Sequence, residues 1–215
     1  MTGADYLSLA RALRPEMLVV LTAFAVLFAD LGWWRTLPTP ARTRRNAALL
    51  TLGMLGAAVA VPLGPEAVDR LEGALSLTPV GQALKVVVLL LAVVAAWLAA
   101  EETFTEHVGE FMAVLSLATT GVLFLLGTEN LLLIFVALEL VSLSLYVLTA
   151  FNARSARGAE AALKYFLFGG TAAGFLLFGF SLLYGLSGSV RLPAVAEVLG
   201  RHATDPLAWV AVVLV

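Results

Sequence analysis

The sequence contains no cysteine and only two histidines. Without thiols, this chain cannot form disulfides, thiolate metal sites or iron–sulfur ligation, so any redox cofactor is expected in another chain. Charged residues make up only 13% of the sequence, and the net charge of -2 is too small to favour a polyanionic partner. Walker-type loops, Gly-x-Gly-x-x-Gly motifs and Ser-His-Asp arrangements are also missing. Conventional active-site chemistry and nucleic-acid binding are therefore not indicated.

Apolar residues account for 61% of the chain, well outside the usual range of soluble proteins. They are grouped into blocks of roughly 17 to 24 residues, each long enough to cross about 30 Å of hydrocarbon as a helix. The six blocks are Glu16–Trp34, Ala47–Leu63, Leu84–Ala100, Phe111–Gly127, Asn130–Phe151 and Ala161–Tyr184. The first lacks a small-residue cleavage site and is interpreted as a retained span. We predict an all-α protein, a polytopic transmembrane helix bundle.

A seventh apolar run, Leu207–Val215, has only about nine residues, which make roughly 13 Å of helix. We therefore expect six complete spans and a truncated seventh, in an N-terminal fragment of a longer protein. The connections are short and contain no soluble domain. Gly64–Ala83 is expected to hold a short strand or an interfacial segment. Glu101–Glu110 is acidic but lacks the spacing of a metal site, so we interpret it as a solvated loop.

Apart from Lys164, which lies within a span, the lysines and arginines are divided equally between the two sides of the predicted bundle, six on each. One side has Arg35, Arg42, Arg44, Arg45, Arg154 and Arg157, and the other has Arg11, Arg14, Arg70, Lys85, Arg191 and Arg201. Charge density in short loops near helix ends has the greatest weight in setting orientation. The first loop contains Arg35, Arg42, Arg44 and Arg45, which favours a cytoplasmic loop and an N-terminus on the outside.

Glu139 is the best-marked candidate functional residue. By helical rise it lies about 14 Å from Asn130 and about 18 Å from Phe151, too deep for its carboxyl to reach water along the surface. Such a group is either protonated, paired with a cation or in contact with a hydrated cavity. A protonated glutamate can simply hydrogen-bond a neighbouring helix, but intramembrane acids usually mark an ion or proton path. We interpret Glu139 as a proton-carrying group.

Lys164 is the second candidate, one to two turns into the sixth apolar block. A lysine at this depth can also extend to the interface as a simple anchor. Helical rise separates Glu139 and Lys164 in depth by about 10 Å, which favours a water-bridged relation over a salt bridge. Glu160, one turn before Lys164, is expected to cap that helix or to pair with the lysine.

Two other features have structural interpretations. Asp30, close to Trp33, Trp34 and Arg35, is expected to be an interfacial acid paired with an arginine. Gly170 and Gly174 form a Gly-x-x-x-Gly spacing, which is typical of close helix packing.

The stretch from Glu110-Phe111 through Ala-Leu-Glu139-Leu-Val-Ser-Leu-Ser-Leu-Tyr146, with Glu160-Ala-Ala-Leu-Lys164-Tyr-Phe-Leu-Phe-Gly and Leu-Tyr184-Gly-Leu-Ser-Gly-Ser, resembles a known family. It is similar to the antiporter-like membrane subunits of respiratory complex I, in particular subunit N of bacterial NADH-quinone oxidoreductase, called subunit 2 in organelles. The similarity covers about residues 110–190 and is only general hydropathy before that. Ser144 stands where the family usually has proline, which puts a kink after Glu139 in doubt.

The resemblance implies that residues 1–109 form an N-terminal three-helix membrane region. It implies that residues 110–215 begin an antiporter-like proton-translocating repeat. Glu139 and Lys164 would then be a proton relay, driven by electron transfer in partner subunits that hold NADH, FMN, iron–sulfur clusters and quinone. The partner lysine of Glu139 would come on the seventh helix. The subunit would be located in the cell inner membrane.

Three alternatives share the buried charges or the hydropathy. They are a subunit of a multisubunit cation/proton antiporter, a subunit of a membrane-bound hydrogenase and a non-catalytic membrane scaffold. The last predicts that Glu139 can become glutamine without loss of transport.

Overall fold

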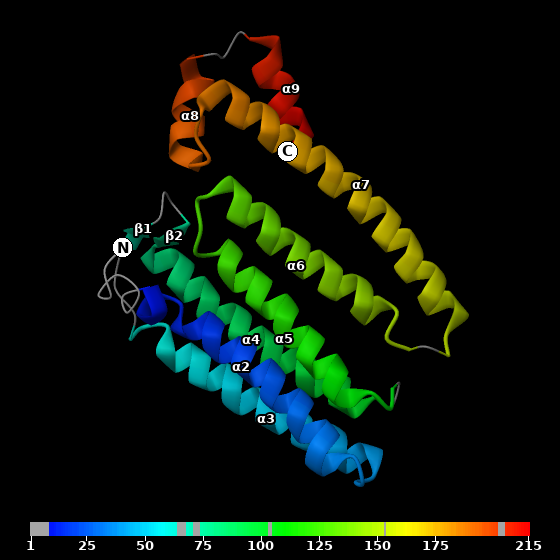
Figure 1. Cartoon of the computed structure of the whole chain (residues 1–215). Helices are drawn as coiled ribbons and strands as arrows, with labels where there is room; N and C mark the ends of the chain where they lie inside the picture. The colour runs from blue at the N-terminus through cyan, green and yellow to red at the C-terminus, as the bar shows by residue number, and fades with distance from the viewer. Residues whose placement is uncertain (1–8, 64–67, 71–73, 103–104, 153, 202–204) are drawn as a thin grey trace.

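The structure is a computed structural model that describes residues 9–63, 68–70, 74–102, 105–152, 154–201 and 205–215. The described chain is mostly helical (Figure 1). The long elements are α2 (Arg14–Ala29), η1 (Asp30–Trp34), α3 (Thr39–Ala60), α4 (Pro79–Glu101), α5 (Val108–Leu125), α6 (Leu131–Thr149) and α7 (Ala156–Ser187). Two shorter helices follow, α8 (Leu192–Arg201) and α9 (Pro206–Leu214). The predicted helical class is confirmed.

Helices α2 to α5 pack as one bundle, in which α2 contacts both α3 and α5 and α4 lies against α3. Helix α6 covers α5, and α7 contacts α6 on the side away from the bundle (Figure 1). Helices α8 and α9 both contact α7 and lie towards one of its ends (Figure 1). The molecule is therefore built outward from α5, with α6 between the bundle and α7.

Five of the described helices are long and apolar enough to cross a membrane: α2 with η1, α4, α5, α6 and α7. The structure is thus that of a multi-pass membrane protein. Helix α3 is not among the five, because its first two turns contain Arg42, Arg44, Arg45 and Asn46 and leave Ala47–Ala60 as its apolar part. The count of six complete spans and a truncated seventh is not confirmed.

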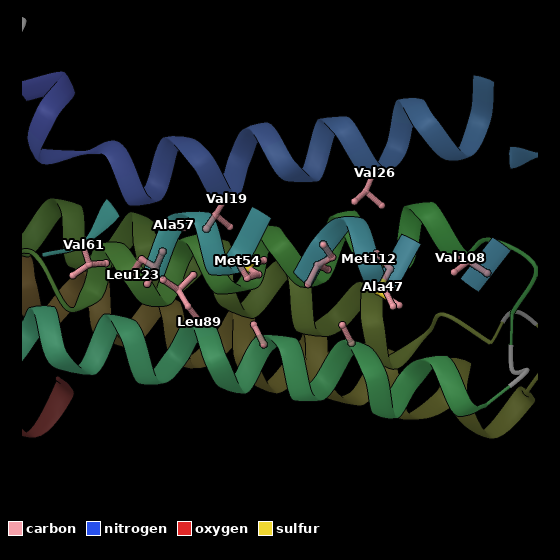
Figure 2. Packing of buried hydrophobic residues seen from close by; sticks show 13 residues of the cluster. Val19, Val26, Ala47, Met54, Ala57, Val61, Leu89, Val108, Met112 and Leu123 are labelled. Carbon is pink, nitrogen blue, oxygen red and sulfur yellow. The ribbon is translucent and has the colours of Figure 1, made fainter. Parts of the chain in front are cut away.

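The main buried cluster lies between α2, α3, α4 and α5 (Figure 2). Its side chains include Val19 of α2, Met54 of α3, Leu89 of α4 and Met112 of α5, all fully buried. Close approach of α2 and α3 requires Gly53, where a Cβ would lie 2.0 Å from the Thr22 Oγ1 atom. The cluster crosses the predicted boundary at residues 109 and 110, and the division into two regions stays a prediction.

The segment predicted to hold a short strand or an interfacial segment contains a hairpin. Strand β1 (Val68–Arg70) pairs antiparallel with β2 (Leu75–Leu77), with Asp69 opposite Ser76. The Ser76 amide donates to the Gly127 carbonyl over 2.9 Å, which ties β2 to the end of α5. Helix α8 was not predicted. Its Val195 side chain is buried with Leu131 and Phe180, so this amphipathic helix folds back on α6 and α7.

Helix α6, which carries Glu139, runs without interruption from Leu131 to Thr149. Asn130 caps its start, with Oδ1 accepting from the Leu132 and Leu133 amides. Ser144 lies inside the helix and its hydroxyl donates to the Leu140 carbonyl over 2.7 Å. A proline at this position would remove a backbone bond and bend the helix. In this chain α6 therefore has no proline kink after Glu139.

Candidate functional site

A partly open cavity of about 630 Å³ lies between α6, α7 and α9. Glu139, Ser142 and Tyr146 line it from α6, because spacings of three and four residues place side chains on one helix face. Helix α7 contributes Tyr165 and Gly169, and the last residues of α9 complete the lining. The predicted glutamate therefore lies in a cavity that also contains two phenol groups and a hydroxyl.

Glu139 is half-buried in the middle of α6, about 12 Å from Leu131 and about 15 Å from Thr149 by helical rise. No described residue forms a hydrogen bond or ion pair with its carboxyl group in the structure. Of the three environments predicted for this carboxyl, contact with a cavity is the one the described residues provide. Close packing of α5 beneath it depends on Gly121, where a Cβ would lie 2.9 Å from the Ala137 carbonyl oxygen.

The position of the Tyr146 side chain depends on a glycine of α7, Gly169. A Cβ at Gly169 would lie 1.8 Å from the Tyr146 hydroxyl oxygen, so only glycine leaves room for it. The ring is buried and meets Tyr165 edge to face, with centroids 4.8 Å apart. Aromatic pairs in this geometry stabilise a contact by about 0.5–1.5 kcal/mol beyond burial. The phenol is therefore held at the edge of the Glu139 cavity.

Lys164 does not line this cavity, and the structure does not bring it into contact with Glu139. Its Nζ atom lies 2.5 Å from Glu160 Oε1, one turn earlier on α7, which confirms that Glu160 pairs with the lysine. The cap of α7 is Ser155, whose Oγ accepts from the Gly158 amide. The Lys164 side chain is 65% exposed on the surface of the described chain. Its assignment to a relay stays a prediction.

Gly170 and Gly174 were predicted to pack closely against another helix, and this was wrong for the described chain. A Cβ at either position would meet nothing within 4 Å. The close contact of α7 with α6 instead uses Gly169, one residue earlier. The one-turn spacing of Gly170 and Gly174 does not tell which face of α7 meets a neighbour, because that depends on the rotation of the helix.

Sequence reasoning missed an ion pair between Glu16 of α2 and Lys85 of α4. The Lys85 Nζ and Glu16 Oε1 atoms are 2.5 Å apart, and the two side chains are 3% and 2% exposed. The orientation count includes Lys85 as a cation on one side of the bundle, but the structure buries this side chain about two turns inside α4. The available signal was that Glu16 and Lys85 lie at similar depths in apolar segments that start on the same side.

Asp30 is fully buried at the opposite end of α2, and its predicted pairing with an arginine is confirmed. Its carboxylate accepts two bonds from the Arg42 guanidinium, one from the Asn46 amide over 2.6 Å and one from the Gly109 backbone amide. The π-helical turn η1 begins at Asp30. This network joins α2, α3 and α5 and is structural. Among the described residues, histidines and carboxylates do not gather into a metal-binding cluster.

Comparison with known proteins assigns the class of this chain. Residues 128–215 match the family described as NADH:quinone oxidoreductase/Mrp antiporter, TM. A solved structure titled respiratory complex I from Thermus thermophilus with bound Aureothin aligns with a TM-score of 0.66 at 31% identity. The alignment covers 92% of this chain and 42% of the Thermus thermophilus chain. An archaeal membrane-bound sulfane sulfur reductase has the same fold, with a TM-score of 0.73 at 23% identity over 94% of this chain and 42% of the other. In its fold and over the matched segment, the chain is similar to antiporter-like membrane proteins.

Curated relatives narrow this class. NADH-quinone oxidoreductase subunit N 2 of Acidobacterium capsulatum is 44% identical over all of this chain and 45% of its own length. NADH-quinone oxidoreductase subunit N of Gemmatimonas aurantiaca is 36% identical over 92% of this chain and 40% of its own length. The chain is an N-subunit-like membrane protein, which confirms the resemblance drawn from the sequence. It spans less than half the length of these relatives.

Proposed function

We propose that this chain is part of a membrane-arm subunit of a proton-pumping NADH-quinone oxidoreductase, with Glu139 as a group that takes up and releases protons. The observation that carries the proposal is the position of Glu139. It lies in the middle of an apolar helix, lines a cavity of about 630 Å³ and has no partner among the described residues. A carboxyl group so placed can change its protonation when a nearby cation or water moves.

The chemistry is divided between chains. This chain contains no cysteine to hold an iron–sulfur cluster. In the proposed complex, NADH, FMN, iron–sulfur clusters and quinone are bound by partner subunits. Electron transfer there changes the hydration or charge at one end of a series of buried groups. Glu139 exchanges a proton in response to this change in hydration or charge, and Lys164 acts as the second member of the relay. The proton moves without any redox step in this chain.

The proposed arrangement in the membrane follows from these roles. Helix α3 crosses the bilayer as a sixth span despite its arginines, with its N-terminal turns at the cytoplasmic surface. Helix α9 begins the seventh span. Residues 1–109 form an N-terminal three-helix region and residues 110–215 begin the proton-translocating repeat, in the inner membrane of the cell.

A second candidate is a subunit of a multisubunit cation/proton antiporter. The description of the matched family includes the Mrp antiporter, and that observation favours this alternative over a scaffold. A membrane-bound hydrogenase subunit and a non-catalytic scaffold are further outcomes of the test below. In an antiporter, proton exchange at Glu139 would be driven by a cation gradient and not by electron transfer.

The test is purification of the full-length subunit, through an affinity tag, from the native membrane. The proposal predicts an assembly that oxidises NADH with quinone and acidifies vesicles only while NADH is supplied. An assembly that exchanges Na⁺ for protons without NADH would support the antiporter. Hydrogen evolution would support the hydrogenase. Loss of the assembly in a strain lacking the gene, together with native proton movement in the assembly with Glu139→Gln, would support the scaffold.

A further inference from the structure

The Glu16–Lys85 pair lies in the bundle of α2 to α5, away from the Glu139 cavity. Both side chains are almost completely buried, and their charged atoms are 2.5 Å apart. The two residues are 69 positions apart in the sequence, so the contact exists only because α2 and α4 start on the same side of the bundle. Lys85 lies about 9 Å into α4 by helical rise.

Packing alone does not account for this pair. The cost of removing two charges from water can exceed their mutual attraction, so apolar residues of similar volume stabilise such a position equally well or better. Glu16 Oε2 is also buried without a hydrogen-bond partner, and an unsatisfied carboxylate oxygen adds to that cost. The site therefore retains a charged pair with one unfilled acceptor at an energetic disadvantage.

The surroundings leave room for the lysine and for one water. A Cβ at Gly127 would lie 2.8 Å from Lys85 Nζ, so glycine at the end of α5 is what admits the ammonium group. Lys85 and Gln82 line a small cavity of about 10 Å³, together with Pro15 and Leu77. This volume is about what a single water requires, and the polar side chains provide its partners.

On the other side of the pair, Glu16 lines a cavity of about 240 Å³ whose other residues are all apolar. The residues that line the two cavities come from α2, α4, α5 and β2, from the residues just before α2 and from the residue after α3. They include no titratable side chain besides the pair itself. Arg14, two residues before Glu16, is exposed, and Glu129, which follows the end of α5, accepts from Ser76. Proton exchange is therefore expected through the polar cavity beside Lys85.

We propose that Glu16 and Lys85 form a second proton-binding site of this subunit. In the resting site Glu16 is a carboxylate and Lys85 an ammonium. Lys85 passes a proton to Glu16 Oε1 and takes another from a hydronium ion in the cavity beside it. The hydronium ion becomes water, and a carboxylic acid is left next to an ammonium. The site thus gains one proton and one positive charge, and the reverse steps return the proton to the water.

The test rests on the proposed proton translocation, and compares Glu16→Gln, Lys85→Met and the double variant in vesicles that contain the whole complex. The measured quantity is the number of protons moved per NADH oxidised. A proton-binding site predicts that all three variants lower this ratio about two-fold or more, and that the double variant is no better than the worse single one. Glu139→Gln, measured in parallel, reports on the proposed function separately.

A pair that serves only packing predicts the opposite for the double variant. Removing both charges leaves no unpaired ion, so assembly and the native ratio would return, and this result would overturn the proposal. If the charge-removing variants do not assemble, Glu16→Asp keeps both charges but lengthens the gap to Lys85. The proposal then predicts a lowered ratio for Glu16→Asp, and a native ratio in the assembled complex would overturn it.

Discussion

Two glutamates on the membrane helices, Glu139 and Glu16, have opposite surroundings. Glu139 lines a cavity and has no partner among the described residues, whereas Glu16 is buried against a lysine. An intramembrane carboxyl is costly in either setting unless it is protonated or paired. The two residues therefore represent the two ways in which this fold can accommodate an acid, and both permit proton exchange.

Variants of Lys164 distinguish a role in the proton relay from a role as an interfacial anchor. Lys164→Ala should lower the protons moved per NADH more than Lys164→Arg does, because arginine keeps the positive charge but does not release its proton. Proton uptake by vesicles at a fixed rate of NADH oxidation measures the difference. Native ratios for both variants would show that Lys164, paired with Glu160 on the surface of α7, is an interfacial anchor.

Gly169 and Gly170 offer a matched pair of substitutions. Gly169→Ala forces the buried Tyr146 hydroxyl to move and should destabilise the contact of α6 with α7 by about 1–3 kcal/mol. Gly170→Ala meets nothing within 4 Å and should leave stability unchanged or slightly raised. The thermal unfolding midpoint of the purified protein compares the two. Equal midpoints would contradict the placement of Tyr146 against α7.

At the scale of helices and strands, apolar length predicted where most helices lie, because a span of about 20 apolar residues has few alternatives in lipid. Contacts between particular residues of different helices could not be predicted from apolar length. Helix α8 was missed because ten residues with apolar positions at Leu192, Val195 and Leu199 read as a loop between two spans. The Glu16–Lys85 contact was missed because neither residue lies in mid-span and their pairing depends on the rotation of two helices.

The Asp30 network joins α2, α3 and α5, and its removal tests how much this contact stabilises the protein. Asp30→Ala removes the carboxylate that Arg42 and Asn46 share with the Gly109 amide, and leaves the Arg42 guanidinium without its carboxylate partner. Breaking such a buried pair should cost about 3–5 kcal/mol of stability. Arg154→Ala, which breaks the exposed pair with Glu106, is the control and should have little effect. Equal losses of thermal stability in the two variants would refute the structural role of η1.

For the whole molecule, the structure revises the charge count that set the orientation. Lys85 is buried against Glu16 in the bundle, so the side that also contains Arg11, Arg14, Arg70, Arg191 and Arg201 has one cation fewer to set the orientation. On the other side, Arg42 is paired with the buried Asp30 and leaves the count in the same way, so each side keeps five. The orientation therefore still depends on the density of Arg35, Arg44 and Arg45 near one short loop, which favours its placement in the cytoplasm.

Because the chain has no cysteine, single cysteines can report this orientation without background. Thr39→Cys should react with a membrane-impermeant thiol reagent only in inside-out vesicles. Glu197→Cys on α8, at the opposite end of the bundle (Figure 1), should react in intact cells. The reverse labelling pattern would invert the topology.

The central claim, that Glu139 carries protons, is tested most directly by the number of protons moved per NADH in vesicles with Glu139→Gln in the full-length subunit. Glutamine keeps the volume and hydrogen bonding of glutamate but cannot exchange a proton, so the ratio should fall to about half or less while the complex still assembles. Glu197→Gln, on the surface of α8, should keep the native ratio. A native ratio for Glu139→Gln in the assembled complex would contradict the account.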